Sequence, residues 1–350
     1  MAKTEIRSLQ VFRGLAALAV VASHVAFSTE AFVGSMPGVA QSVFGLGYLG
    51  VDFFFVLSGF IIMFAHMCDQ PSLATVQRYA FKRLVRIFPA YLPISIALIA
   101  LYATMPGFSA SGGRDYSLLS SLLLLPADKP PALSVAWTLV HELMFYAVFL
   151  LFFVSRRWLV IGFVLWGGAI ITSNLFLVPS GWLRYPMSLL NIEFMFGVLS
   201  AWVVKSAVYR GDPKRLVVLG LAMVSVMLVV IHQTPSTYLR LLLAFGLACM
   251  MVGFALWEQS VSLPWPGWLL LIGNASYSIY LIHNPLVSVT QRVAARIGLD
   301  WAGAMVFGVV LSVLAGYVYY RLVERPSLDF FRKRLGPIRN DGVRRPAVTH

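Results

Sequence analysis

The stretch Arg13-Gly-Leu-Ala-Ala-Leu-Ala-Val-Val-Ala-Ser-His24 lies inside an apolar segment running from Leu9 to Phe27. The segment predicts a membrane-spanning helix with a cation near one end and an imidazole near the other. Eleven positions separate Arg13 from His24, so at about 100° and about 1.5 Å per residue the side chains share a face and stand roughly 16 Å apart. Ionisable groups inside a membrane helix are costly and indicate a functional site by default. The pair therefore predicts a lined path, with charge binding at one end and proton chemistry at the other.

Simpler interpretations of this segment stay open. Arg13 could extend its charge to the inner interface, and His24 could be a hydrogen-bonded polar residue near the outer one. A cleaved signal peptide is disfavoured, because Arg13 would lie at the edge of its short apolar run and nothing downstream resembles a secreted domain.

Composition indicates the fold class. Of the 350 residues, 59% are hydrophobic and 12% are charged, and the mean hydropathy is +0.81. Soluble proteins average about 45–50% apolar and about 25% charged residues. The long apolar runs do not alternate as barrel strands would. We therefore predict an all-α, polytopic membrane protein, because helices satisfy their own backbone hydrogen bonds in lipid.

Hydropathy predicts about ten membrane spans. They cover residues 8–27, 48–66, 87–104, 135–154, 158–177, 187–205, 215–232, 238–257, 270–290 and 302–322. With the N-terminus inside, 21 of the 27 Lys and Arg residues fall on the inner side and 6 on the outer side. The positive-inside rule thus predicts two cytoplasmic termini and explains the net charge of +13 without nucleic acid as a partner.

Outside the predicted spans, the sequence predicts a long outer loop and a C-terminal tail. The outer loop 105–134 is the longest and is a candidate lid or acceptor-contact loop. We expect residues 1–330 to form one transmembrane domain and residues 331–350 to form a disordered, basic cytoplasmic tail that contacts anionic lipid.

Polar residues recur at one level in the outer half of several predicted spans. They are His24, Asp52, His141, Glu142, Asn191, Glu193, His283 and Asn284. Any one of them could make an ordinary hydrogen bond between helices, and for Asn191, Glu193 or Asn284 alone this is the better interpretation. Together they predict a cavity, since a dry bundle would not bury so many carboxylates and imidazoles.

A second polar group lies near the predicted inner face. Arg83 and Arg86 are three residues apart and share a helix face, so with Arg13 they could hold a polyanion. Ordinary positive-inside residues are the alternative. Acyl-coenzyme A fits both levels, since its phosphates are followed by a long arm that ends in a thioester. His24 is then a candidate general base, with Asp52 or Glu142 orienting it. No ligand spacing predicts a metal site.

Five stretches resemble the acyltransferase family 3 membrane proteins, especially those used in bacterial exopolysaccharide production. They are Leu9-Gln-Val-Phe-Arg-Gly-Leu-Ala-Ala-Leu18 with His24, Gly50-Val-Asp-Phe-Phe-Phe-Val-Leu-Ser-Gly-Phe60, Arg83-Leu-Val-Arg-Ile-Phe-Pro89, Ala136-Trp-Thr-Leu-Val-His-Glu-Leu-Met-Phe-Tyr146 and Ser276-Tyr-Ser-Ile-Tyr-Leu-Ile-His-Asn-Pro285. The resemblance covers essentially the whole membrane domain.

The resemblance implies an O-acyltransferase that moves acetyl from acetyl-coenzyme A to a hydroxyl of a surface polysaccharide or its lipid-linked precursor. It implies that His24, Asp52 and Glu142 are the catalytic residues and that Arg13, Arg83 and Arg86 bind the donor. Two further residues, His283 and Trp137, are candidates for sugar binding, with a structural hydrogen bond and packing as their respective alternatives. The neighbouring His141 is not part of the family pattern and receives no role.

The resemblance further implies a multi-pass protein of the bacterial inner membrane. The expected partners are the lipid bilayer, the glycan acceptor and polysaccharide-synthesis proteins. A transporter or flippase for a lipid-linked sugar or an anionic metabolite is the alternative, since intramembrane His and carboxylates also form proton relays. The repeats typical of transporters are not seen in the sequence. A scaffold for a polysaccharide synthase would not need the stripe from Arg13 to His24.

Overall fold

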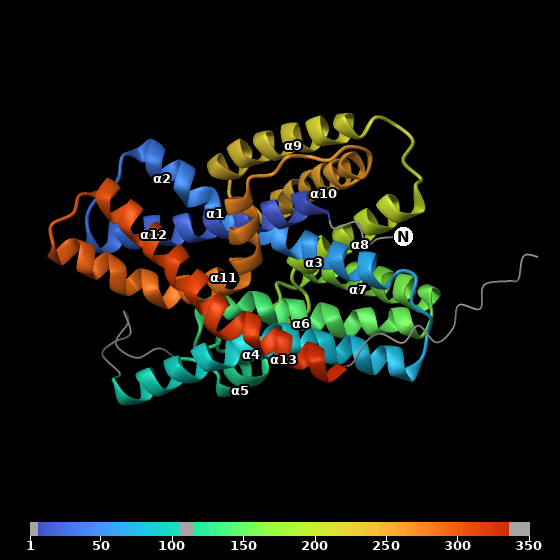
Figure 1. Ribbon diagram of the computed structural model, residues 1–350, viewed down its shortest axis with the longest axis horizontal. Helices are drawn as coiled ribbons and strands as arrows, with labels where there is room; N and C mark the ends of the chain where they lie inside the picture. The colour runs from blue at the N-terminus through green and yellow to red at the C-terminus, as the bar shows by residue number, and fades with distance from the viewer. Residues whose placement is uncertain (1–5, 106–114, 336–350) are drawn as a thin grey trace, which may run out of the picture.

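The computed structural model describes residues 6–105 and 115–335 (Figure 1). Its long helices are α1 (Arg7–Phe32), α3 (Gly50–His66), α4 (Leu73–Thr104), α6 (Trp137–Phe149), α7 (Arg156–Phe176), α8 (Leu190–Ser206), α9 (Pro213–Gln233), α10 (Thr237–Ser260), α11 (Gly267–Arg296) and α12 (Trp301–Tyr319). The shorter helices are α2 (Gly38–Gly45), α5 (Leu118–Leu123), α13 (Arg325–Leu335) and a π-helical segment at Tyr320–Glu324. Neither described range contains a strand, and the predicted all-α fold is confirmed.

Eight helical segments in the described ranges are long and apolar enough to cross a membrane. Each of them overlaps one of eight of the ten predicted spans, and several extend beyond it, as Leu73–Thr104 does beyond 87–104. The remaining two, 187–205 and 270–290, are also helical. However, α8 is only 17 residues long, and α11 interrupts its apolar sequence with Asn274, His283 and Asn284. The protein is therefore a polytopic helical membrane protein, while the count of ten spans and the cytoplasmic termini stay predictions.

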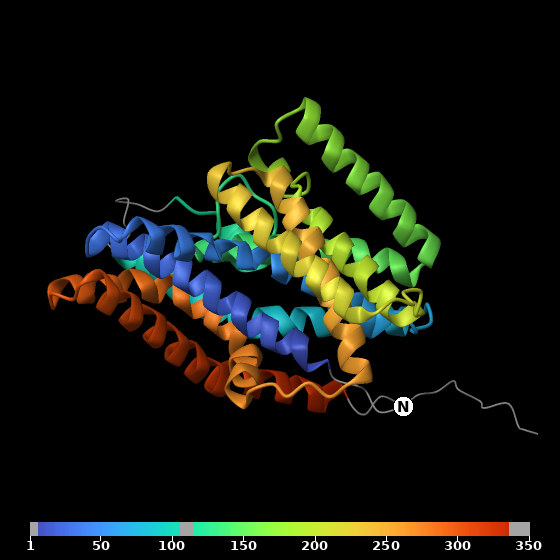
Figure 2. The ribbon, with the colours of Figure 1, turned by 90° about the horizontal axis from the view of Figure 1, so that it is seen from above.

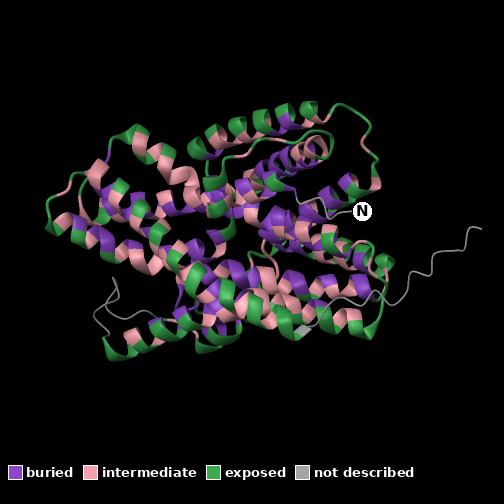
Figure 3. Cartoon of the chain, in the orientation of Figure 1, coloured by how far each residue is buried: buried purple, intermediate pink, exposed green. Residues whose placement is uncertain are grey.

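The helices pack around α1, which runs through the middle of the molecule (Figure 1). It contacts α11 and α12 on one side and α3 and α10 on the other. The turned view shows α7 at one edge of the molecule, away from α12 (Figure 2). Buried residues concentrate on α1, α3 and α6, whereas α9 is exposed along most of its length (Figure 3). The exposed faces are apolar, as expected for surfaces that lie against lipid.

Glycines set how closely α3 and α8 approach. A Cβ on Gly59 would overlap the backbone oxygen of Phe194, and a Cβ on Gly197 would overlap that of Val56. Small residues allow such close backbone contact where membrane helices cross. This contact fixes α3, which supplies one wall of the cavity described below.

The described part of the predicted outer loop folds back onto α4. The carbonyl of Ser121, in α5, accepts hydrogen bonds from Tyr91 at 2.8 Å and from Ser95 at 2.7 Å. Residues 106–114 of this candidate lid lie outside the described residues. At the other end of the chain, α13 continues to Leu335, five residues beyond the expected domain boundary at 330. The rest of the expected tail, 336–350, is likewise outside the described residues.

Candidate active site

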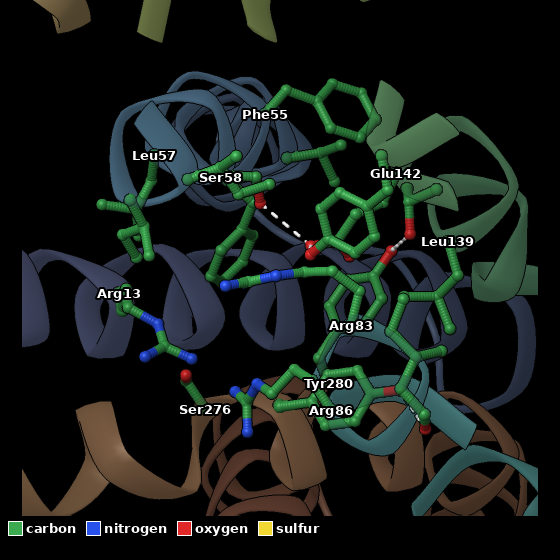
Figure 4. Close-up of a pocket in the computed structure, with 18 residues that line it drawn as sticks. Arg13, Phe55, Leu57, Ser58, Arg83, Arg86, Leu139, Glu142, Ser276 and Tyr280 are labelled. Atoms are coloured by element: carbon green, nitrogen blue, oxygen red, sulfur yellow. Dashed lines mark hydrogen bonds between the residues drawn. The ribbon is translucent and has the colours of Figure 1, made fainter. Parts of the chain in front are cut away.

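A cavity of about 300 Å³ lies among α1, α3, α4, α6 and α11 (Figure 4). Its polar lining consists of Arg13, Ser58, Arg83, Arg86, Thr138, Glu142, Tyr146, Ser276, Tyr277 and Tyr280. Its apolar lining comes from α3, with Val51, Phe54, Phe55, Leu57, Ile61 and Ile62, and from Ile87 and Leu139. The cavity thus combines a cationic region with an apolar wall.

The three arginines predicted to act together do line this one cavity. Figure 4 shows their guanidinium groups turned toward a common space. Glu142 lies on the side of Arg83 that faces away from Arg13. Arg13 donates a hydrogen bond of 3.1 Å to the side chain of Gln10. No carboxylate pairs with Arg13 or Arg83 among the salt bridges of the described residues, so these two charges are available to an anion.

Arg83 is held by aromatic rings and retains an unused donor. Its guanidinium lies over the rings of Tyr79 and Tyr146, at 5.5 and 5.7 Å from their centres, and 3.3 Å from Nε2 of His66. Its Nε is buried and has no hydrogen-bond partner in the described structure; the same holds for Oγ of Ser276. Buried polar atoms are rarely unpaired. Two such atoms in the lining of one cavity indicate a polar ligand.

Arg86 differs from the other two arginines because it has a carboxylate partner. Its Nη1 donates to Glu324, which is 2% exposed and ends the π-helical segment. The second oxygen of Glu324 accepts a hydrogen bond of 2.6 Å from Ser278. The guanidinium of Arg86 also lies 5.0 Å from the ring centre of Tyr277. One of the three cavity cations is thus partly neutralised, and π-helical turns often mark functional sites.

Glu142 points into the cavity and bonds to its walls. One oxygen accepts hydrogen bonds from Tyr146 and, at 3.1 Å, from Ser58 (Figure 4). The other oxygen accepts no hydrogen bond from the described residues. This carboxylate therefore ties α6 to α3 and lines the same cavity as the three arginines. It makes no hydrogen bond with His24 in the described structure.

His24 lies in the C-terminal half of α1 and contacts a second histidine. Its Nδ1 is 3.0 Å from Nε2 of His283 and 3.1 Å from the carbonyl of Val20. His24 keeps part of its surface exposed, whereas His283 is fully buried. The sequence placed both histidines at one level but did not predict that they touch.

Asp52 is engaged elsewhere. Both of its oxygens accept hydrogen bonds from Arg240, at 2.9 and 3.0 Å, and the carboxylate is fully buried. Glu193 is also fully buried and adjoins this pair. In the described structure Asp52 makes no hydrogen bond with His24. The arrangement is that of a buried ion pair holding α3 to α10, in which bidentate geometry compensates part of the cost of desolvation.

Trp137 and His141 pack behind the cavity wall and do not line it. The ring of Trp137 lies 6.2 Å from that of Phe55 and 5.6 Å from that of His141. His141 donates through Nδ1 to the side chain of Asn191 at 2.9 Å. Packing, the alternative interpretation of Trp137, describes its position in this structure.

Tyr280 connects the cavity to the two histidines. It lines the cavity, bonds Thr138 at 3.0 Å and has its ring 5.6 Å from that of His283. Tyr280 therefore lies between the cavity and the histidine pair, although neither histidine lines the cavity. The lined path from Arg13 to His24 stays a prediction.

Sequence reasoning missed two charged partners in this region, Glu324 and Arg240. Glu324 lies two residues past the predicted span 302–322, and Arg240 lies near the start of the predicted span 238–257. A charge that lies within one turn of an apolar segment was the available signal for both. No group of three metal-ligating side chains that could hold a metal ion occurs in residues 6–105 and 115–335.

Comparison with known proteins finds a family whose pattern this sequence matches. The family described as "Acyltransferase domain" matches residues 6–321, nearly the whole chain. No solved structure matches.

Two curated relatives cover most of the chain. It is similar to the exopolysaccharide production protein ExoZ of Rhizobium meliloti (strain 1021), with 29% identity over 317 residues, or 83% of this chain and 92% of that protein. It is also similar to the acyltransferase MdmB of Streptomyces mycarofaciens, with 26% identity over 371 aligned positions, or 93% of this chain and 92% of that protein. Protein 2 in the picA locus of Rhizobium radiobacter is 30% identical over 162 residues, which is 40% of this chain and 78% of that protein.

Proposed function

The chain belongs to acyltransferase family 3, and we propose that it transfers an acetyl group from acetyl-coenzyme A to a hydroxyl of a surface polysaccharide or its lipid-linked precursor. The match over residues 6–321 makes it a membrane acyltransferase. The donor and the acceptor are the proposed part. Similarity to an exopolysaccharide production protein over 92% of that protein's length supports a glycan as the acceptor.

The proposal that acetyl-coenzyme A is the donor rests on the residues that line the cavity. Arg13 and Arg83 present guanidinium groups without a carboxylate partner among the described residues, and Nε of Arg83 and Oγ of Ser276 are unpaired donors. Phosphate groups satisfy such donors through charge-assisted hydrogen bonds. The apolar wall from α3 fits the uncharged arm that follows the phosphates of coenzyme A. In this proposal Arg86 contributes a further charge, moderated by Glu324.

His24 is the proposed general base. Its Nε2 takes the proton of the acceptor hydroxyl as the oxygen attacks the thioester carbon. The carbon–sulfur bond then breaks, and the coenzyme A thiolate leaves with the proton that His24 returns. The ester and free coenzyme A are the products, so protons and bonds balance without a metal or an oxidant.

Asp52 and Glu142 receive different proposed parts from those implied by the family resemblance. Since neither bonds to His24 in the described structure, we propose that Glu142 shapes the donor cavity through Ser58 and Tyr146, and that Asp52 holds Arg240. With the N-terminus in the cytoplasm, Arg13 lies on the cytoplasmic side of His24, and the donor enters from there. This orientation, in a bacterial inner membrane, is part of the proposal.

Binding of radiolabelled acetyl-coenzyme A to the purified protein in lipid nanodiscs tests the donor site. We expect saturable binding that Arg83→Gln weakens. Arg78→Gln, an exposed arginine of the same helix α4, is the matched control and should bind as the wild type does. Absence of saturable binding to the folded wild type, or equal binding by both variants, contradicts the proposed donor site. A transporter or flippase would then have to be considered for this cavity.

A further inference from the structure

The histidine pair lies between two parallel helices in matched register. α1 and α11 pack closely at Gly14 and Gly273, where a Cβ on Gly14 would be only 3.0 Å from the backbone nitrogen of Gly273. Ten residues further along each helix stand His24 and His283. Beyond them, Thr29 and Gln291 share a buried hydrogen bond of 3.1 Å. The close approach at the glycines is what brings the two imidazoles within hydrogen-bond distance.

The neighbouring carbonyls determine which nitrogen carries each proton. Nδ1 of His283 lies 3.2 Å from the carbonyl of Ile279. A carbonyl can only accept, so Nδ1 of His283 is the donor, and in the neutral ring its Nε2 is an acceptor. Nδ1 of His24 faces that Nε2 at 3.0 Å and the carbonyl of Val20 at 3.1 Å. Both neighbours are acceptors, so His24 is protonated at Nδ1.

This assignment leaves Nε2 of His24 with a free lone pair. No hydrogen bond of the described residues engages that atom. A base in a proton transfer needs an unprotonated nitrogen directed at its substrate, and the hydrogen bond at the other nitrogen sets the tautomer. His24 retains exposed surface, whereas His283 has none. Of the two rings, only His24 can therefore meet an acceptor hydroxyl in this structure.

We infer that His283 is the positioning residue of His24: it accepts the Nδ1 proton, fixes the ring with Nε2 free, and stabilises the imidazolium formed when Nε2 takes a proton. The inference rests on the proposed function, in which His24 is the base. It gives His283 the place that a carboxylate holds in a Ser-His-Asp triad. Neither Asp52 nor Glu142 is placed to do this. Because His283 is fully buried, it is also not placed to bind a sugar.

Kinetics of two substitutions test the positioning role. His283→Leu introduces an apolar side chain of similar size that cannot accept the hydrogen bond from Nδ1 of His24. His283→Gln instead offers an amide oxygen as the acceptor. We expect His283→Leu to lower kcat about 10²-fold with an unchanged KM for acetyl-coenzyme A. The loss is smaller than the about 10⁴-fold cost of disabling the triad aspartate, because the carbonyl of Val20 still accepts from Nδ1. His283→Gln should recover most of the activity, and His232→Leu, at an exposed histidine, should not change it.

A second measurement does not depend on activity. In protein labelled with ¹⁵N-histidine, the resonances of His24, identified by their loss in His24→Gln, should show a neutral ring protonated at Nδ1. A ¹⁵N–¹⁵N coupling across the hydrogen bond to His283 should disappear in His283→Leu. An Nε2-protonated His24 in the wild type, or an unchanged kcat in a folded His283→Leu, overturns the inference. If His24→Ala retains full acyl transfer, His24 is not the general base and the inference falls with that role. If the folded wild-type protein transfers no acetyl group from acetyl-coenzyme A, the proposed function itself fails, whatever the NMR result shows.

Discussion

Two arginines three residues apart in α4 should respond differently to the same substitution. Arg83 and Arg86 both line the cavity, but only Arg86 is paired with a buried carboxylate, Glu324. We expect Arg83→Gln to weaken donor binding with little effect on stability. We expect Arg86→Gln to lower stability as well, because it leaves Glu324 buried and unpaired.

The magnitudes follow from these contacts. A hydrogen bond to a charged group contributes about 1.5–3 kcal/mol. Loss of one such bond between Arg83 and a phosphate should raise Kd or KM for the donor about 10- to 150-fold. The Glu324 side chain is 1% exposed, and removing one partner of a buried ion pair destabilises a protein by about 3–5 kcal/mol. Because the Arg86 side chain is 29% exposed, we expect a value near the lower end, about 3 kcal/mol.

The assay is a double-mutant cycle in nanodiscs, with thermal unfolding and donor binding measured on the same samples. Arg86→Gln and Glu324→Gln should each lower the unfolding temperature, and the double variant should recover part of the loss. Arg78→Gln serves as the control at an exposed site of α4. The reasoning is refuted if Arg83→Gln binds the donor as well as the wild type does, or if the losses caused by Arg86→Gln and Glu324→Gln simply add.

Two further substitutions test the contacts that hold α3 against α10 and α8. Asp52→Asn should destabilise the protein by about 3 kcal/mol, because Arg240 loses its charged partner; thermal unfolding that matches the wild type would argue against this pair. Gly59→Ala should force α3 and α8 apart, since its Cβ would overlap the backbone of Phe194. It should lower both the unfolding temperature and donor affinity, because α3 forms a cavity wall; loss of neither would show that the helices can separate without consequence.

The sequence was sufficient to predict the all-α membrane fold and the cationic end of the site. Helical spacing placed Arg83 and Arg86 on one face, and the positive-inside rule placed them at the same level as Arg13. The cavity brings these three together with Glu142. Such inferences work because depth along a membrane helix follows directly from position in the sequence.

Rotation of each helix about its axis could not be predicted in the same way. His24, Asp52 and His283 were expected at one depth, but which of them touch depends on how α1, α3 and α11 turn toward each other. The glycine contact between α1 and α11 selects His283 as the partner of His24, and α10 supplies Arg240 to Asp52. A single sequence records neither contact.

Glu324 shows a second limit. It lies far along the chain from Arg86, in a π-helical turn that continues α12 toward α13. Hydropathy ends the last span at about residue 322, so a buried acidic partner just past that end was not expected. The same irregular turn places the carboxylate toward the cavity arginines.

The most direct test of the account is the O-acyl content of the surface polysaccharide, measured by proton NMR in a deletion strain that expresses either the wild-type protein or His24→Ala. Acyl signals present with the wild type and absent with His24→Ala, at equal membrane levels of the two proteins and with polymer still exported, are the predicted result. Equal acyl signals from both strains would contradict a general-base role for His24. Loss of the polymer itself in the deletion strain would indicate a flippase or a scaffold in place of the proposed glycan acyltransferase.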